Sequence, residues 1–204
     1  LQEILRDDPS NFQARRRLAM VLLDEGFNKE ALAHFQFLAN LFKNDANLFY
    51  NIGITHEKLK DFKEAEKSYL KAIKLAPENA DFHYNLGLVY IELKEYNKAI
   101  SNFMRVLEDD TNDSNTFFNL GICYSKLGRD EDASKCFKKT VSINDNDVFA
   151  HFYLGYYYKK FGEGLTLFPP KELIEKYTAD INISQVFSCA SLEQMCAEQG
   201  LQKN

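Results

Sequence analysis

The chain has 204 residues, of which 45% are hydrophobic and 27% are charged, and its formal net charge is −5. This composition is typical of a folded soluble protein rather than a disordered one. The acidic balance argues against a nucleic-acid surface, and no apolar run approaches the roughly 20 residues of a membrane-spanning helix. The four cysteines form no C-x-x-C pair, which favours a reduced, cytoplasmic compartment.

Four similar stretches recur along the chain. They are FYNIGITHEKL (49–59), HYNLGLVYIEL (83–93), FFNLGICYSKL (117–127) and HFYLGYYYKKF (151–161). Their glycines, Gly53, Gly87, Gly121 and Gly155, follow one another at intervals of 34 residues. A fixed period of roughly 20–50 residues indicates a protein built from structural repeats.

Each period contains two helical patterns. The first runs through the glycine and carries apolar residues at helical spacing, as at Leu86, Val89 and Leu93. The second follows a short polar turn and places an alanine four residues before an aromatic residue, as at Ala99 and Phe103. Alanine and glycine are small, so they let a neighbouring helix approach closely.

Helix-turn-helix units of 34 residues with glycine, alanine and aromatic residues in these positions resemble tetratricopeptide repeats. The resemblance covers about residues 1–162 and implies an all-α, right-handed superhelical solenoid in which the first helix of each unit lines a concave groove. The first unit departs from the pattern, because Ala19 replaces the glycine and Leu22 the tyrosine.

We predict three regions along the chain. Residues 1–11 are the end of a truncated preceding repeat, residues 12–162 are the repeat array, and residues 163–204 are C-terminal capping helices or a tail. The array divides into units at 12–45, 46–79, 80–113 and 114–147, followed by the first helix of a fifth unit at 148–162.

The repeat pattern ends inside the fifth unit. Pro169 and Pro170 fall where its second helix would lie, and proline there removes amide donors and clashes with the preceding turn. We predict instead a helix over 171–181 and a last short helix that starts with a capping box at Ser191 and Gln194. These helices either cap the solenoid, which we favour, or fold back into its groove as an internal ligand.

We find no catalytic or metal-binding constellation in the sequence. His83 and His151 lie two periods apart, too far for a shared metal in a rigid stack. The acidic loop 109–113 lacks the glycine and the closing glutamate of a calcium-binding loop. We interpret Cys123 and Cys136 as buried, inert thiols. The sequence therefore predicts a chain with no enzymatic activity, no cofactor and no metal.

An asparagine recurs two residues before three of the glycines, at Asn51, Asn85 and Asn119. We expect these side chains on the groove face of the first helices. Asparagine is a mediocre helix former, and its carboxamide both donates and accepts hydrogen bonds, so the row can bind a peptide backbone. It resembles the asparagine ladder in the repeat arm of O-linked N-acetylglucosamine transferases. The alternative is that asparagine is simply common at this place in tetratricopeptide repeats.

An aromatic residue precedes each asparagine, at Tyr50, Tyr84 and Phe118. These rings either form apolar pockets between the asparagines or belong to the core between repeats. Further groove positions are Asn47, Asp81 and Asn115, which are neutral or acidic. Repeats that dock chaperone C-termini need lysine at such places, so a clamp for a terminal carboxylate is disfavoured here.

The sequence thus predicts an adaptor or scaffold that binds a peptide segment of a partner protein along its groove. Two alternatives stay open. The chain is a substrate-recognition arm of a larger enzyme, or it is a scaffold that self-associates into homo-oligomers. We expect no binding to nucleic acid and no membrane insertion.

Overall fold

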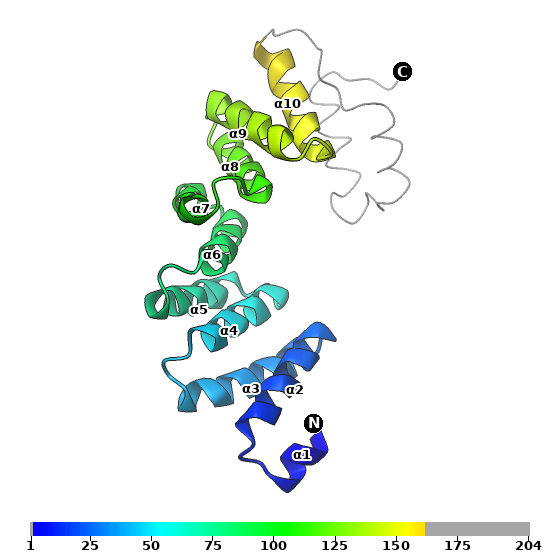
Figure 1. The fold of residues 1–204 in the computed structure, drawn as a ribbon, viewed down its shortest axis with the longest axis vertical. Coiled ribbons are helices and arrows are strands. Elements are labelled where there is room, and N and C mark those ends of the chain that lie inside the picture. Colours follow the sequence, from blue (N-terminus) through cyan, green and yellow to red (C-terminus); the bar gives the residue numbers. More distant parts are fainter. Residues whose placement is uncertain (1, 162–204) are drawn as a thin grey trace. The chain divides into compact units, whose positions relative to one another are not determined.

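The computed structural model describes residues 2–161, and these form ten α-helices with no strand among them (Figure 1). The all-α prediction is therefore confirmed for this part of the chain. The helices predicted within 163–204 lie outside the described residues. The ten helices are α1 (Gln2–Asp7), α2 (Phe12–Asp24), α3 (Asn28–Leu41), α4 (Ala46–Lys58), α5 (Phe62–Leu75), α6 (Ala80–Glu92), α7 (Tyr96–Asp109), α8 (Ser114–Lys126), α9 (Asp130–Ile143) and α10 (Val148–Phe161).

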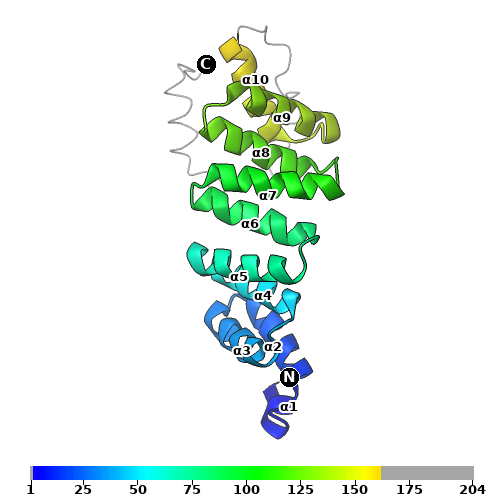
Figure 2. The ribbon, with the colours of Figure 1, turned by 90° about the vertical axis from the view of Figure 1, so that its left-hand side faces the viewer.

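The helices fall into two compact units that divide within α9, between Cys136 and Phe137. In the first unit, α2 pairs with α3, α4 with α5 and α6 with α7, and each pair packs on the next through α3 and α4, α5 and α6, or α7 and α8. Figure 2 shows α4 to α8 as successive layers. In the second unit, α10 packs on the end of α9, where the ring of Phe137 stacks on Tyr153 at 4.8 Å.

The first helices also contact one another directly, α4 with α6 and α6 with α8. We call α2, α4, α6 and α8 the first helices, and α3, α5 and α7 the second helices. The first helices begin alike, because an Asn or Asp side chain before each one accepts a hydrogen bond from a backbone N–H of the first turn. These capping residues are Asn11, Asp45, Asn79 and Asp113.

The turn between the two helices of a pair needs one residue with left-handed backbone. Gly26, Lys60, Lys94 and Gly128 occupy this place at intervals of 34 residues, with φ of 86°, 60°, 59° and 71°. Glycine adopts such a conformation without a steric cost, whereas lysine does not. The lysines show that the packing of the two helices imposes the turn even where the local sequence opposes it.

The periodic glycine is where the two helices of a pair approach most closely. A Cβ atom at Gly53 would lie 2.5 Å from the ring of Tyr69, and one at Gly87 would lie 2.6 Å from the ring of Phe103. Both rings are fully buried, and so are Ala65 and Ala99, the alanines four residues before them. The recurring glycine of the sequence is therefore a packing residue.

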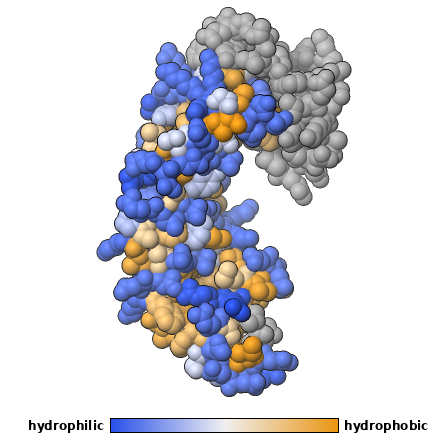
Figure 3. Space-filling view, viewed as in Figure 1, coloured by the Kyte–Doolittle hydropathy of each residue, from blue (hydrophilic) through white to orange (hydrophobic). Residues whose placement is uncertain are grey.

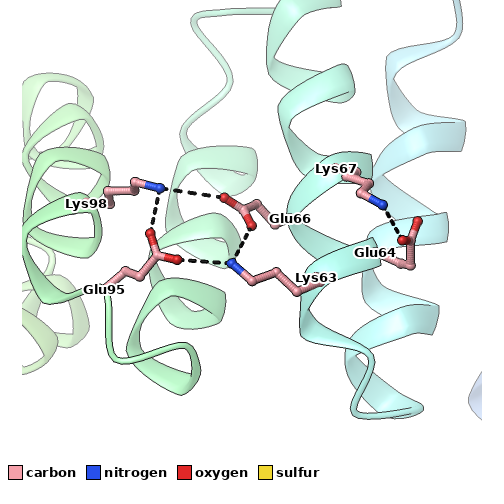
Figure 4. A network of polar contacts seen from close by, with 6 residues as sticks. All are labelled: Lys63, Glu64, Glu66, Lys67, Glu95 and Lys98. Atoms are coloured by element: carbon pink, nitrogen blue, oxygen red, sulfur yellow. Dashed lines mark hydrogen bonds and ion pairs between the residues drawn. The ribbon is translucent and has the colours of Figure 1, made fainter.

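A ring of ion pairs on the second helices joins neighbouring pairs (Figure 4). Lys63 of α5 contacts Glu66 at 3.2 Å and Glu95 at 3.0 Å, and Lys98 of α7 contacts Glu95 at 2.5 Å and Glu66 at 3.9 Å. Exposed ion pairs of this kind contribute little individually. Their arrangement as a closed ring fixes the register of α7 against α5.

The surface over the N-terminal helices is more apolar than the rest. In Figure 3 apolar patches interrupt a mostly hydrophilic face over the lower, N-terminal half. Eight large hydrophobic side chains between residues 4 and 42 are exposed, against two in the remaining part that the structure describes. The eight are Ile4, Phe12, Met20, Val21, Phe27, Phe37, Leu41 and Phe42.

The substitution Gly87→Ala tests the close approach of α6 and α7. The added methyl group would meet the Phe103 ring at 2.6 Å, so we expect a loss of about 2 kcal/mol in the free energy of unfolding, measured by urea titration. The control is Asn97→Ala, at an exposed site on α7, which we expect to change it by less than about 0.5 kcal/mol. Equal stability of the glycine variant and the wild type would contradict the packing role.

Candidate functional site

The predicted site lies along one face of each first helix. Residues spaced at i, i+4, i+7 and i+11 share a helix face, and in α4, α6 and α8 this face shows the same sequence of exposed, half-buried, half-buried and exposed residues. We call these twelve positions the stripe. They are Asn47, Asn51, Ile54 and Lys58 on α4; Asp81, Asn85, Leu88 and Glu92 on α6; and Asn115, Asn119, Ile122 and Lys126 on α8.

Two of the three predicted asparagines form hydrogen bonds to the preceding first helix. The amide nitrogen Nδ2 of Asn85 donates to the hydroxyl of Tyr50 at 2.9 Å. Nδ2 of Asn119 donates to the hydroxyl of Tyr84 at 3.1 Å. Donor and acceptor lie 35 residues apart in both cases, so we call these contacts the Tyr–Asn bonds. They join the predicted asparagine row to the predicted aromatic row.

The three asparagines differ in which hydrogen-bond donors and acceptors of the side chain stay unpaired. Asn85 also donates to the backbone carbonyl of Asp81 at 2.9 Å, so both of its amide hydrogens are occupied and its oxygen Oδ1 stays an acceptor. Asn119 uses one amide hydrogen. The side chain of Asn51 makes no hydrogen bond within residues 2–161. The residue 35 positions before it is Arg16, which pairs with Asp45 at 2.5 Å instead.

Tyr50 and Tyr84 pack their rings against core aromatic residues and direct their hydroxyls to the asparagines of the stripe. The ring of Tyr50 lies 4.8 Å from that of Phe82, and the ring of Tyr84 lies 5.8 Å from that of Phe103. Burial raises the pKa of both tyrosines, and a nearby carboxylate, Asp81 for Tyr50, raises it further. The hydroxyls are therefore neutral at physiological pH, and each keeps its own hydrogen to donate while it accepts from asparagine.

The remaining predicted residues lie beside this network. Phe118 is half-buried and has no hydroxyl, and the residue 35 positions after it is Tyr153 rather than asparagine. Asn47 and Asn115 are exposed at the first stripe position of their helices. Sequence reasoning missed the Tyr–Asn bonds. The signal was available, because tyrosine and asparagine occur together at a spacing of 35 residues and are lost together at Phe118.

Two of the histidines contact backbone carbonyls, and two of the cysteines stay protonated. Nε2 of His83 lies 2.9 Å from the carbonyl oxygen of Pro77, and Nε2 of His151 lies 2.9 Å from that of Asp145. Cys123 is buried as predicted, whereas Cys136 is half-buried, and burial raises the pKa of both thiols to about 12, so both stay protonated. Residues 2–161 contain no group of three His, Cys, Asp or Glu side chains placed to hold a metal ion.

The helix pairs α2/α3, α4/α5 and α6/α7 define the class of the protein. It is an α-helical solenoid of helix-turn-helix repeats. Residues 58–94 match the family model described as TPR repeat, and residues 78–146 match the one described as Tetratricopeptide repeat. Residues 58–146 of the chain are tetratricopeptide repeats. Proteins of this fold typically act as scaffolds for interactions between proteins. In the described residues, no helix is long and apolar enough to cross a membrane.

Solved structures of the same fold include MamA and YrrB. MamA from Desulfovibrio magneticus RS-1 is 24% identical, with a TM-score of 0.71 over 83% of this chain and 93% of that one. YrrB, described as a TPR protein with an unusual peptide-binding site, is 20% identical, with a TM-score of 0.68 over 94% of this chain and 97% of that one. No curated protein matches the sequence. At these identities the likeness shows the fold.

A double-mutant cycle on Tyr84 and Asn119 measures the Tyr–Asn bond. Because each single change removes one partner of the same bond, we expect Tyr84→Phe and Asn119→Ala to be less than additive, with a coupling of about 1 kcal/mol in the free energy of unfolding.

The measurement is urea denaturation followed by circular dichroism. Tyr96→Phe with Asn119→Ala is the control pair, since the hydroxyl of Tyr96 makes no hydrogen bond to Asn119. Strict additivity for Tyr84 and Asn119 would show that their contact adds no stability.

Proposed function

We propose that the chain is an adaptor that binds an extended segment of a partner protein along the stripe of α4, α6 and α8. The observation that carries this proposal is the row of accessible carboxamides on three consecutive first helices that contact one another. First helices packed in this way lie about 10 Å apart, and an extended peptide rises about 3.3 Å per residue. One asparagine therefore meets about every third residue of the bound segment.

Each asparagine has a defined role in this binding. Oδ1 of Asn85 accepts from a peptide N–H, because its amide hydrogens are already used. Asn51 offers both its amide hydrogens and its oxygen, and Asn119 offers one amide hydrogen and its oxygen. The hydroxyls of Tyr50 and Tyr84 donate to peptide carbonyls. Backbone contacts of this kind hold a segment whatever side chains it carries.

Apolar residues between the asparagines hold the side chains of the segment. Ile54, Leu88 and Ile122 occupy the third stripe position and are half-buried, so each presents an apolar surface beside a carboxamide. Asn47 and Asn115 extend the site at its first position. The peptide-binding site named in the description of YrrB supports peptide recognition as a use of this fold.

The proposal gives the chain a binding role without catalysis, cofactor or metal, in the cytoplasm. The protonated thiols of Cys123 and Cys136 and the contacts of His83 and His151 with backbone carbonyls are in keeping with such a role. In such a scaffold the carboxamides of the stripe hold the segment, and a few other stripe positions select the partner.

Asn51→Ala is the sharpest test, because its side chain makes no hydrogen bond within residues 2–161. We expect unchanged thermal stability and an affinity for a bound peptide that falls about fivefold, the equivalent of one hydrogen bond of about 1 kcal/mol. The peptide is selected on an array of 15-residue segments, and its Kd is measured by fluorescence anisotropy.

The matched control is Asn97→Ala, an exposed asparagine on the second helix α7. We expect it to bind as the wild type does. Unchanged affinity of the Asn51→Ala variant would mean that the asparagine row does not hold the peptide. Asn85 and Asn119 are less suitable, because their substitution also removes a Tyr–Asn bond and lowers stability.

A further inference from the structure

The stripe of α6 differs in charge from its two neighbours. At the first stripe position α6 carries Asp81, where α4 and α8 carry asparagine. At the fourth position it carries Glu92, where α4 and α8 carry Lys58 and Lys126. The middle of the stripe therefore has two carboxylates on one helix, and the first position is neutral on either side of it.

Asp81 has no cationic partner within residues 2–161. Ion pairs occupy other acidic residues of the chain, as with Asp45 and Arg16, but none involves Asp81. Its side chain is exposed on the stripe, and its backbone carbonyl holds Asn85. The negative charge also reaches Tyr50, since the Asp81 carboxylate contributes to the raised pKa of that hydroxyl. The geometry agrees, because the amide nitrogen of Asn85 lies 2.9 Å from both the Tyr50 hydroxyl and the Asp81 carbonyl, so Asp81 lies beside the half-buried Tyr50.

Two further carboxylates, Glu57 and Glu92, lie near the C-terminal ends of α4 and α6. Glu57 of α4 accepts a hydrogen bond from the hydroxyl of the buried Tyr69. Burial raises the pKa of Glu57, and the charge of Glu92 raises it further, so the two carboxylates repel each other. Lys58, the basic residue at the fourth stripe position of α4, forms no ion pair within the part of the chain that the structure describes.

We propose that Asp81, beside Tyr50, selects a basic side chain in the bound segment. This inference rests on the proposed function and names the class of partner: an extended peptide with one lysine or arginine opposite Asp81. A carboxylate next to an aromatic ring suits such a cation, because it offers an ion pair and a cation–π contact together. An acidic segment would instead place like charges along a stripe that carries a carboxylate at both ends of α6.

The neighbouring stripe positions define the rest of the segment. Asn47 and Asn115 occupy the same stripe position as Asp81 on α4 and α8 and are uncharged. With one first helix for about every third peptide residue, the basic residue is flanked about three positions away on both sides by residues that need no charge. Ile54 and Leu88 favour apolar peptide residues between the basic residue and these uncharged positions.

The test uses an array of nine-residue peptides, acetylated and amidated, in which the central residue is Lys, Arg, Gln or Glu and all other positions are degenerate. Wild-type protein is compared with Asp81→Asn, which installs the residue of both neighbouring repeats, and with Asp81→Lys. The control is Asp109→Asn, an exposed carboxylate on the second helix α7. Circular dichroism checks that all variants fold.

We expect the wild type and the Asp109→Asn control to bind peptides with central Lys or Arg about fivefold more strongly than those with Glu, in line with an exposed ion pair. Asp81→Asn abolishes the preference, and Asp81→Lys reverses it. Binding without a charge preference, or a preference that survives Asp81→Lys, overturns this inference and leaves the proposed function standing. Failure to bind any peptide on the array overturns both.

Discussion

The contact between a glycine and an aromatic ring determines most of this structure. Gly53 lets the ring of Tyr69 reach the backbone of α4, and Gly87 does the same for Phe103 and α6. Because any larger side chain would push the ring away, the two helices of a pair have one rotation in which they fit. That rotation buries one face of each first helix and leaves the stripe uncovered, so the same packing that forms the repeat also exposes the surface that we propose for binding.

The Tyr–Asn bonds connect this packing to the stripe. Tyr50 packs its ring against Phe82 in the core, while its hydroxyl reaches Asn85 on the next first helix. An asparagine in this position therefore stabilises the array through its amide hydrogens and remains an acceptor through its oxygen. The two interpretations of the asparagine row, structural and functional, are compatible for Asn85, because different atoms of one carboxamide carry them. Asn51 makes no such bond, so under the proposed function its whole carboxamide is open to a bound segment.

The sequence allowed the helix pairs to be predicted well and the side-chain contacts between repeats poorly. The 34-residue period and the positions of glycine and alanine depend on packing within one pair, which local spacing describes. The left-handed backbone of Lys60 depends on how tightly α4 and α5 pack within one pair, and the Tyr–Asn bonds depend on how one pair is placed against the next. The period does not define that placement. His83 illustrates this, since its bond to the Pro77 carbonyl crosses from one repeat to the end of the previous one.

The stripe combines positions that the fold constrains with positions that it leaves free to vary. Its half-buried middle positions are constrained, because Asn85 bonds to Tyr50 and Leu88 packs beside the core. Its outer positions, such as Asp81 and Glu92, are exposed and make no contact that the fold requires, so their charge can change without loss of stability. Under the proposed function, a repeat array can therefore keep its contacts to the peptide backbone in the carboxamides and vary its selectivity at the ends of each first helix. In this chain that variation falls on α6, where both outer positions carry a negative charge.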